Sequence, residues 1–212
     1  HFFENPKWSY GDKETPYVPT YCDKILAPGA NTVRFLEFFG NKGKCEATGL
    51  PRFDHYKGKP ELSPPTYKTI RVGVMSSNTA GYTQEQIENS IALFISIDEV
   101  LMNADGCELK WRLRKGFNDK LPFDAINSPE KGLDEFIANV DVVICQPSTA
   151  AYEAMMLGKP TAIADFGASP NYMRGAWEIR KPEQILDIVK DMAQLPKHKA
   201  LMQQYILEQN LY

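Results

Sequence analysis

Short apolar segments alternate with longer segments of helical periodicity along most of the chain. The strand candidates after residue 66 are residues 70–75, 108–114, 142–145 and 161–164. Three of them are mainly apolar runs, which is typical of strands that are buried on both faces of a parallel sheet. The segment at residues 108–114 alternates apolar and basic side chains, and this period of two also predicts a strand.

Helices are predicted between these strands. Thr83 opens one of them, because Gln86 follows at the spacing of a capping box and apolar residues then recur at helical spacing. The sequence Ser-Pro-Glu from Ser128 predicts a second helix start. A short helix is expected to open at Ser148, and a final helix includes residues 185–192. Strands separated by helices predict an α/β fold with a doubly wound parallel sheet.

A smaller unit precedes this region. Two strand candidates flank a predicted helix and form a partial βαβ unit, with the three elements at residues 23–27, 30–39 and 44–48. Residues 57–66 contain three prolines and one glycine, which a strand or helix interior does not tolerate. We therefore expect the incomplete end of an N-terminal Rossmann-like domain in residues 1–56, a linker in residues 57–66 and a C-terminal domain in residues 67–212.

Composition and charge narrow the class of protein. The 212 residues are 43% hydrophobic and carry a formal net charge of −3, as in an ordinary globular protein without a nucleic-acid partner. No apolar run reaches the ~18 residues of a membrane span and no signal peptide is visible, so we expect a cytoplasmic location. The chain has no initiator methionine and stops within a predicted helix, so we expect it to be part of a longer protein.

Metal and disulfide chemistry are not expected. The four cysteines are widely spaced without a CxxC pair, and the three histidines share no ligand-like spacing. The cysteines are therefore predicted to be reduced thiols. No DxD-like motif stands out, so we predict activity without a metal ion.

The most informative segment follows the strand at residues 142–145. Ser148 and Thr149 bring two hydroxyls to a helix N-terminus, where unpaired N–H groups and the helix dipole favour an anion such as phosphate. Glu153 lies four residues after Thr149, on the same helix face, and its carboxylate suits the hydroxyls of a ribose. These three residues predict a nucleotide site. The alternative is an ordinary N-cap serine with a solvent-facing glutamate.

Several motifs resemble one enzyme superfamily. Asp141-Val-Val-Ile, Ser148-Thr-Ala-Ala-Tyr-Glu-Ala and Gly158-Lys-Pro resemble the C-terminal domain of GT-B-fold glycosyltransferases and of the related UDP-sugar 2-epimerases. Thr48-Gly-Leu-Pro-Arg-Phe-Asp54 resembles the end of the N-terminal domain in surface-polysaccharide transferases, including the glycerophosphotransferases of wall polymers. The resemblance covers most of the chain and implies that residues 67–212 bind a nucleotide sugar.

The resemblance also implies roles for individual residues. Ser148 and Thr149 would contact the phosphates of a nucleotide diphosphate sugar, with UDP as the favoured nucleotide, and Glu153 would contact its ribose. The loop after the first strand of the C-terminal domain would approach the phosphates from the other side. That loop contains Ser76, Ser77, Asn78 and Thr79, and it lacks the several glycines that the family's loop often has.

The nucleotide base and the pyrophosphate charge have further candidates. Arg114 could offset the charge of the pyrophosphate, although Lys115 is followed by glycine where relatives often carry His-Pro. The base would lie near Phe123 and Ile126. Asp165, at the end of a strand on the same edge, is either a capping residue or a contact for donor or acceptor hydroxyls.

The implied activity is glycosyl transfer from a nucleotide diphosphate donor to a saccharide or lipid-linked acceptor in surface polysaccharide synthesis. The nucleotide sugar is then a substrate, no separate cofactor is expected, and the full protein could associate peripherally with a membrane. No catalytic base is identified, because in GT-B enzymes it usually comes from the N-terminal domain, and this chain alone is expected to be inactive. Asp54 and His55 are interpreted as structural. The alternatives are a UDP-sugar 2-epimerase, a glycerophosphotransferase or a non-catalytic nucleotide-binding domain.

Overall fold

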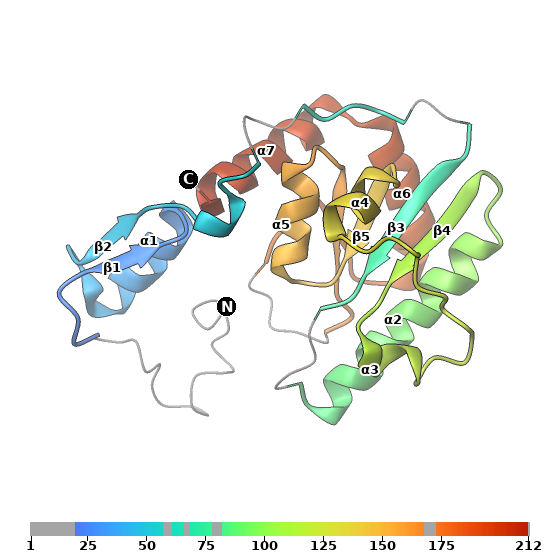
Figure 1. Ribbon diagram of the computed structural model, residues 1–212, viewed down its shortest axis with the longest axis horizontal. Coiled ribbons are helices and arrows are strands. Elements are labelled where there is room, and N and C mark those ends of the chain that lie inside the picture. The colour runs from blue at the N-terminus through green and yellow to red at the C-terminus, as the bar shows by residue number, and fades with distance from the viewer. Residues whose placement is uncertain (1–19, 57–60, 66–67, 78–81, 168–172, 212) are drawn as a thin grey trace.

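The computed structural model describes residues 20–56, 61–65, 68–77, 82–167 and 173–211. Among these residues, two parallel sheets form: a two-stranded sheet near the N-terminus and a five-stranded sheet in the body of the molecule (Figure 1). Helices flank both sheets, which confirms the predicted α/β class. Most of the predicted linker lies outside the described residues or has no regular structure, so the domain boundary there stays a prediction.

The larger sheet has the strand order β4-β3-β5-β6-β7, and every neighbouring pair is parallel. Its strands are β3 (Ile70–Met75), β4 (Cys107–Arg112), β5 (Val142–Cys145), β6 (Thr161–Ala164) and β7 (Trp177–Ile179). After β3 the chain adds β4 on one side and then returns to place β5 on the other side. This reversal is a topological switch point, and ligands of open α/β sheets bind outside the carboxyl ends of the strands there.

Helices cover both faces of the larger sheet. On one face lie α2 (Gln84–Met102) and α6 (Ile185–Gln194), and on the other lie α4 (Leu133–Ala138), α5 (Thr149–Met156) and α7 (Lys197–Leu211). Successive side chains of β5 point to opposite faces of the sheet. Val142 and Ile144 pack in the cluster with α2 and α6, while Val143 and Cys145 pack in the cluster with α4, α5 and α7. This two-sided burial explains why β5 is a continuous apolar run.

The smaller sheet belongs to a βαβ unit, as predicted. It contains β1 (Ile25–Ala27), α1 (Ala30–Leu36) and β2 (Cys45–Ala47), and α1 continues into one π-helical turn at Glu37–Asn41. The C-terminal end of α7 packs against this unit (Figure 1). Gly29 permits the close contact, because a Cβ atom at this position would lie 2.4 Å from the backbone carbon of Asn210. A short 3-10 helix, η3 (Pro51–Phe53), leads from the smaller unit toward the larger one.

The capping box at the start of α2 is confirmed, since the Thr83 hydroxyl accepts from the Gln86 amide and the Gln86 side chain accepts from the Thr83 amide. The helix predicted from Ser128 is wrong, because α4 begins only at Leu133. Instead, Ser128 donates its amide to the carbonyl of Trp111 at 2.9 Å, so this segment lies extended beside β4. Hydrogen bonding to the edge strand β4 therefore outweighs the helix-start signal of Ser-Pro-Glu.

The C-terminal region also differs from the prediction in two places. The segment before the last helices contains an additional edge strand, β7, whose Trp177 and Ile179 are buried while Glu178 is not. A three-residue strand is too short to show a period of two in the sequence. The final helical region is split into α6 and α7, because Leu195 adopts a left-handed conformation (φ 50°) and Pro196 follows it.

One ion pair fastens the amino ends of the two central strands. The guanidinium of Arg71 in β3 donates to both carboxylate oxygens of Asp141, at 3.0 Å and 2.7 Å, and the Arg71 amide donates at 2.8 Å. Burial by itself raises the pKa of the Asp141 carboxyl, but these hydrogen bonds outweigh burial and hold the pKa below its usual range. The ionised carboxylate is therefore the form that the folded chain prefers.

We expect Asp141→Asn to lower the free energy of unfolding by about 2 kcal/mol at pH 7, because the charge-assisted hydrogen bonds from Arg71 are lost. Since the pKa of Asp141 is lowered by folding, its contribution is present above about pH 4 and is lost as the pH falls further. Urea denaturation of both proteins between pH 7 and pH 2 measures the difference and its loss at low pH. Glu108→Gln is the matched control, because its ion pair with Lys110 is exposed and long at 3.9 Å.

Candidate functional site

The loops that follow β3, β4 and β5 meet at the carboxyl edge of the larger sheet, next to the switch point. The Ser76 hydroxyl accepts a hydrogen bond from the Arg114 amide at 2.7 Å, which joins the first two loops. The Ser77 amide donates to the side-chain oxygen of Gln146 at 3.1 Å, which joins the first loop to the third. The described residues that the sequence assigns to the phosphates therefore lie on one edge.

Both described serines of the first loop are turned inward. Ser76 and Ser77 are buried, and the Ser77 hydroxyl is bonded to Gln146 and lies 2.8 Å from the hydroxyl of Tyr82. These contacts hold the loop in place. A contact of Ser76 or Ser77 with phosphate stays a prediction, and Asn78 and Thr79 lie outside the described residues.

Gln146 was not predicted to belong to the site. Its side chain is 1% exposed and also donates to the Ser90 hydroxyl of α2 at 2.9 Å, so one amide connects β5, α2 and the loop after β3. A buried amide needs such partners to offset its desolvation. The only signal in the sequence is a polar residue at the end of an apolar strand, directly before Pro147.

The turn after β5 leads into α5 as predicted. Ser148 is the N-cap residue, but its side chain makes no capping hydrogen bond and its oxygen instead lies 3.4 Å from the sulfur of Cys145. The first amides of a helix have no partner within the helix, so this N-terminus can receive an anion. Ser148 and Thr149 are partly exposed, whereas the helix from Ala151 onward is buried. Burial also raises the pKa of the Cys145 thiol to about 12.

Glu153 does not face solvent, and its carboxylate already has a partner. The residue is 7% exposed, and its Oε1 atom forms an ion pair with Arg52 of η3. A second guanidinium nitrogen of Arg52 lies 3.4 Å from the Thr149 hydroxyl. Burial raises the pKa of Glu153, and the charge of Arg52 opposes this effect. A contact between Glu153 and a ribose stays a prediction, and any such ligand must share the carboxylate with Arg52.

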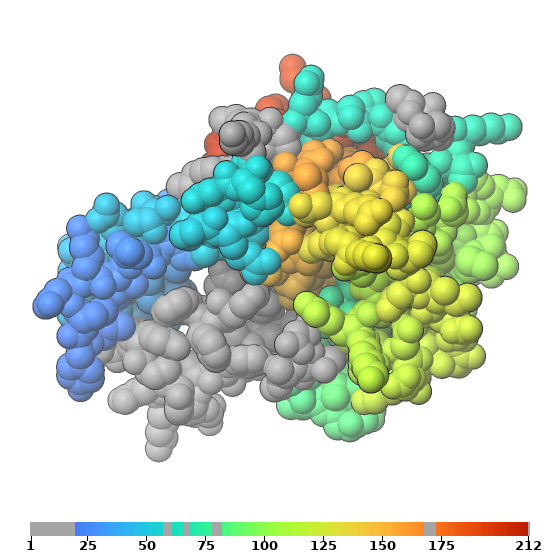
Figure 2. All heavy atoms as spheres, viewed as in Figure 1, coloured from blue at the N-terminus to red at the C-terminus, as the bar shows by residue number. Residues whose placement is uncertain are grey.

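The segment that carries Arg52 is anchored to the larger unit. The neighbouring Phe53 is buried in the same hydrophobic cluster as α5 and α7. The Tyr56 hydroxyl donates to Asp134 of α4 at 2.7 Å, and burial raises the pKa of Tyr56. In Figure 2 this segment, in cyan, lies against the orange α5 and the yellow α4. The ring centroids of His55 and Tyr56 lie 3.9 Å apart, and the structural role of His55 stays a prediction.

The residues expected near the nucleotide base lie beyond β4. Phe123 packs against the indole of Trp111, with ring centroids 5.5 Å apart, while Ile126 is 74% exposed. The Asn127 side chain bonds both the amide and the carbonyl of Leu113, which fixes this segment beside the end of β4. Arg114 follows β4 at the same edge, and its side chain is exposed. Binding of a ligand by these residues stays a prediction.

Asp165 directly follows β6 at the same edge, and its buried carboxylate forms an ion pair with an arginine. The carboxylate is 2% exposed and accepts from Arg180 at 3.2 Å, and Arg180 also contacts Glu178 at 3.1 Å. Burial of a carboxylate is tolerated when a guanidinium compensates its charge. In this structure Asp165 therefore serves to join the ends of β6 and β7.

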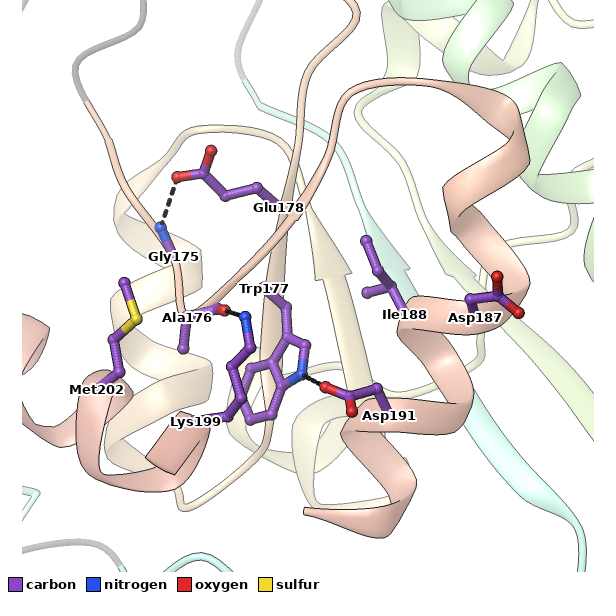
Figure 3. Close-up of a pocket in the computed structure, with 9 residues that line it drawn as sticks. All are labelled: Gly175, Ala176, Trp177, Glu178, Asp187, Ile188, Asp191, Lys199 and Met202. Atoms are coloured by element: carbon purple, nitrogen blue, oxygen red, sulfur yellow. Dashed lines mark hydrogen bonds between the residues drawn. The ribbon is translucent and has the colours of Figure 1, made fainter. Parts of the chain in front are cut away.

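A separate hollow of about 550 Å³ lies toward the amino ends of the strands, between β7, α6 and α7 (Figure 3). Two of its polar side chains form hydrogen bonds within its lining: the Trp177 indole donates to Asp191 at 2.7 Å, and Lys199 donates to the Ala176 carbonyl at 2.5 Å. This hollow is on the opposite edge of the sheet from Ser148. It is therefore not part of the predicted nucleotide site.

Among the described residues, no group of three or more His, Cys, Asp or Glu side chains could hold a metal ion. No helix in this part of the chain is both long and apolar enough to cross a membrane.

No family model matches the sequence, and a search of curated proteins found no significant match. Solved structures do match. A protein assigned as a UDP-N-acetylglucosamine 2-epimerase from Listeria monocytogenes has a TM-score of 0.57 and 14% identity, over 89% of this chain and 56% of that one. The structure of MnaA from S. aureus with UDP has a TM-score of 0.52 and 12% identity, over 90% and 54%.

The wall teichoic acid polymerase TagF is a third similar structure, with a TM-score of 0.51 and 12% identity over 89% of this chain and 54% of that one. The chain thus spans about half the length of the solved structures that it matches. At such low identity the likeness shows the fold. The chain therefore has the Rossmann-like α/β fold of the GT-B type that these proteins share.

Proposed function

We propose that this chain is the nucleotide-sugar-binding part of a GT-B glycosyltransferase. The observation that carries the proposal is the position of the α5 N-terminus at the switch point of the sheet, where Ser148 leaves the first helical amides uncapped by its side chain. The fold, which is shared with the UDP-bound MnaA structure, supports the same site.

The expected binding mode follows from charge. The diphosphate of the donor lies against the first turn of α5, where backbone amides and the hydroxyls of Ser148 and Thr149 donate hydrogen bonds. Arg114, exposed at the same edge, adds a positive charge near the phosphates. Glu153 accepts from the ribose hydroxyls. Ser76 and Ser77 shape the opposite wall through the loop that they hold, and Phe123 and Ile126 lie on the side of the base.

The same arrangement explains how this half contributes to catalysis. When the glycosidic bond of a sugar nucleotide breaks, the diphosphate leaves with an additional negative charge. Fixed amide dipoles and hydroxyls stabilise that charge without reorganising during the reaction. The proposed reaction is transfer of the sugar to a saccharide or lipid-linked acceptor. A 2-epimerase would break the same bond, whereas a glycerophosphotransferase would break the P–O–P linkage of its donor and release a nucleoside monophosphate. Product analysis with UDP- and CDP-activated donors separates the three.

Isothermal titration of the wild-type chain with UDP, GDP, CDP and dTDP tests nucleotide binding. We expect at least one nucleoside diphosphate to bind, and to bind more tightly than its monophosphate, because the second phosphate reaches the helix N-terminus. Thr149→Val should weaken binding about tenfold through the loss of one hydrogen bond to a charged group. Ser96→Ala is the matched control, because this exposed hydroxyl of α2 bonds only its own helix. Absence of binding to all four would refute the proposal.

Metal independence gives a second test of the same site. Because amides, hydroxyls and Arg114 supply the positive potential, we expect nucleotide affinity to be equal in EDTA and in buffer with magnesium. The comparison is made by titration of one protein preparation under both conditions. A strict requirement for the divalent ion would show that a cation, rather than the helix N-terminus, receives the diphosphate.

A further inference from the structure

Arg52 reaches the proposed nucleotide site from a distant part of the sequence. Its guanidinium contacts Glu153 with one nitrogen and approaches the Thr149 hydroxyl with another. These are the residues assigned above to the ribose and to the phosphates. One side chain thus spans the boundary between the two subsites, although Arg52 belongs to η3 and both partners belong to α5.

The surroundings of Glu153 explain why a cation is needed there. The carboxylate is buried, and the negative charge of Asp134 in α4 further disfavours its ionisation, while Arg52 and His55 favour it. Tyr56 and Cys145 are the other titratable groups that face it. An ionised carboxylate is the better partner for the two hydroxyls of a ribose, because it is an acceptor at both oxygens and its hydrogen bonds are charge-assisted. Of the groups around Glu153, Arg52 is the cation in direct hydrogen-bond contact.

We propose that Arg52 is a positioning residue of the nucleotide site, which keeps Glu153 ionised and holds its Oε1 atom so that Oε2 can accept from the ribose hydroxyls. The inference rests on the proposed function. Among the described residues, the side-chain contacts of Glu153 involve Oε1 alone, which leaves Oε2 for a ligand. Arg52 itself remains 55% exposed, so its guanidinium also adds positive charge beside Thr149.

The position of Arg52 makes nucleotide binding sensitive to the packing of η3. Phe53 and Tyr56 hold this segment on the larger unit through the core and through Asp134. A ligand that uses the pair of Arg52 and Glu153 therefore favours the docked arrangement of η3 over an undocked one. The ion pair of Arg52 with Glu153 would thus couple the segment that follows the smaller βαβ unit to the nucleotide site.

The test compares UDP with 2′-deoxy-UDP by titration of the wild-type chain and of Arg52→Ala, Arg52→Lys and Glu153→Gln. We expect wild type to prefer the ribonucleotide, and Arg52→Ala to lose about tenfold in UDP affinity and most of this preference. Arg52→Lys should recover part of both, because it restores the charge without the planar fork. Lys24→Ala, which removes an exposed ion pair with Glu46, is the control and should match wild type.

A pH series gives a readout that a purely structural role would not change. Ionised Glu153 binds the ribose above its pKa, so affinity falls as the pH drops through that value. Removal of Arg52 raises the pKa further, so Arg52→Ala should lose affinity at a higher pH than wild type. Glu153→Gln should lack this dependence, and His55→Gln shows whether His55 contributes to it. Titration of the nucleotide itself is common to all the proteins and cancels in the comparison.

The outcomes separate this inference from the proposed function. If wild type binds UDP but Arg52→Ala keeps the same affinity, the same preference for ribose and the same pH profile, then Arg52 has no positioning role and only the inference fails. If the wild-type chain binds no nucleoside diphosphate, both fail. Circular dichroism and thermal unfolding of each variant show that it is folded, and an unfolded Arg52→Ala is replaced by Arg52→Gln, which keeps the side chain as far as Cδ but removes its charge.

Discussion

The parallel pairing of β3 with both β4 and β5 is the constraint on which the rest of the structure depends. Because the three strands run in one direction, their following loops must emerge at one edge, and the strand order reverses between two of these loops. Gln146 and Ser76 then fix the loops relative to one another by hydrogen bonds. The N-terminus of α5 lies at this switch point because α5 directly follows β5. The order of the strands therefore determines that Ser148 and the N-terminus of α5 lie at the switch point.

Charge at this edge is balanced by residues that are distant in sequence. Glu153 and Asp165 are both buried carboxylates, and each has an arginine partner, Arg52 in one case and Arg180 in the other. The two pairs differ in origin. Arg180 follows the neighbouring strand and closes the end of the larger sheet, whereas Arg52 comes from the segment that joins the smaller unit. The pair of Arg180 and Asp165 therefore stabilises one unit, while the pair of Arg52 and Glu153 links two.

Much of the fold could be predicted from the sequence because apolar runs and capping residues act locally. The core strands β3, β5 and β6 and the start of α2 at Thr83 followed from such signals. Contacts between distant residues could not be predicted in this way. The pairing of Arg52 with Glu153 spans 101 positions, and the extended segment at Ser128 owes its conformation to β4. For the site, the sequence indicated the edge and the helix, but the partners Gln146 and Arg52 emerged only from tertiary packing.

The buried thiol of Cys145 has a consequence of a different kind. It lies at the end of β5 next to the turn that opens α5, and its high pKa keeps it protonated at neutral pH. A protonated and inaccessible sulfur does not react with alkylating reagents, whereas Cys22 is exposed. Modification of Cys145 would thus require the packing around the end of β5 to open, so the rate of its alkylation would report how often the core beneath the proposed nucleotide site opens.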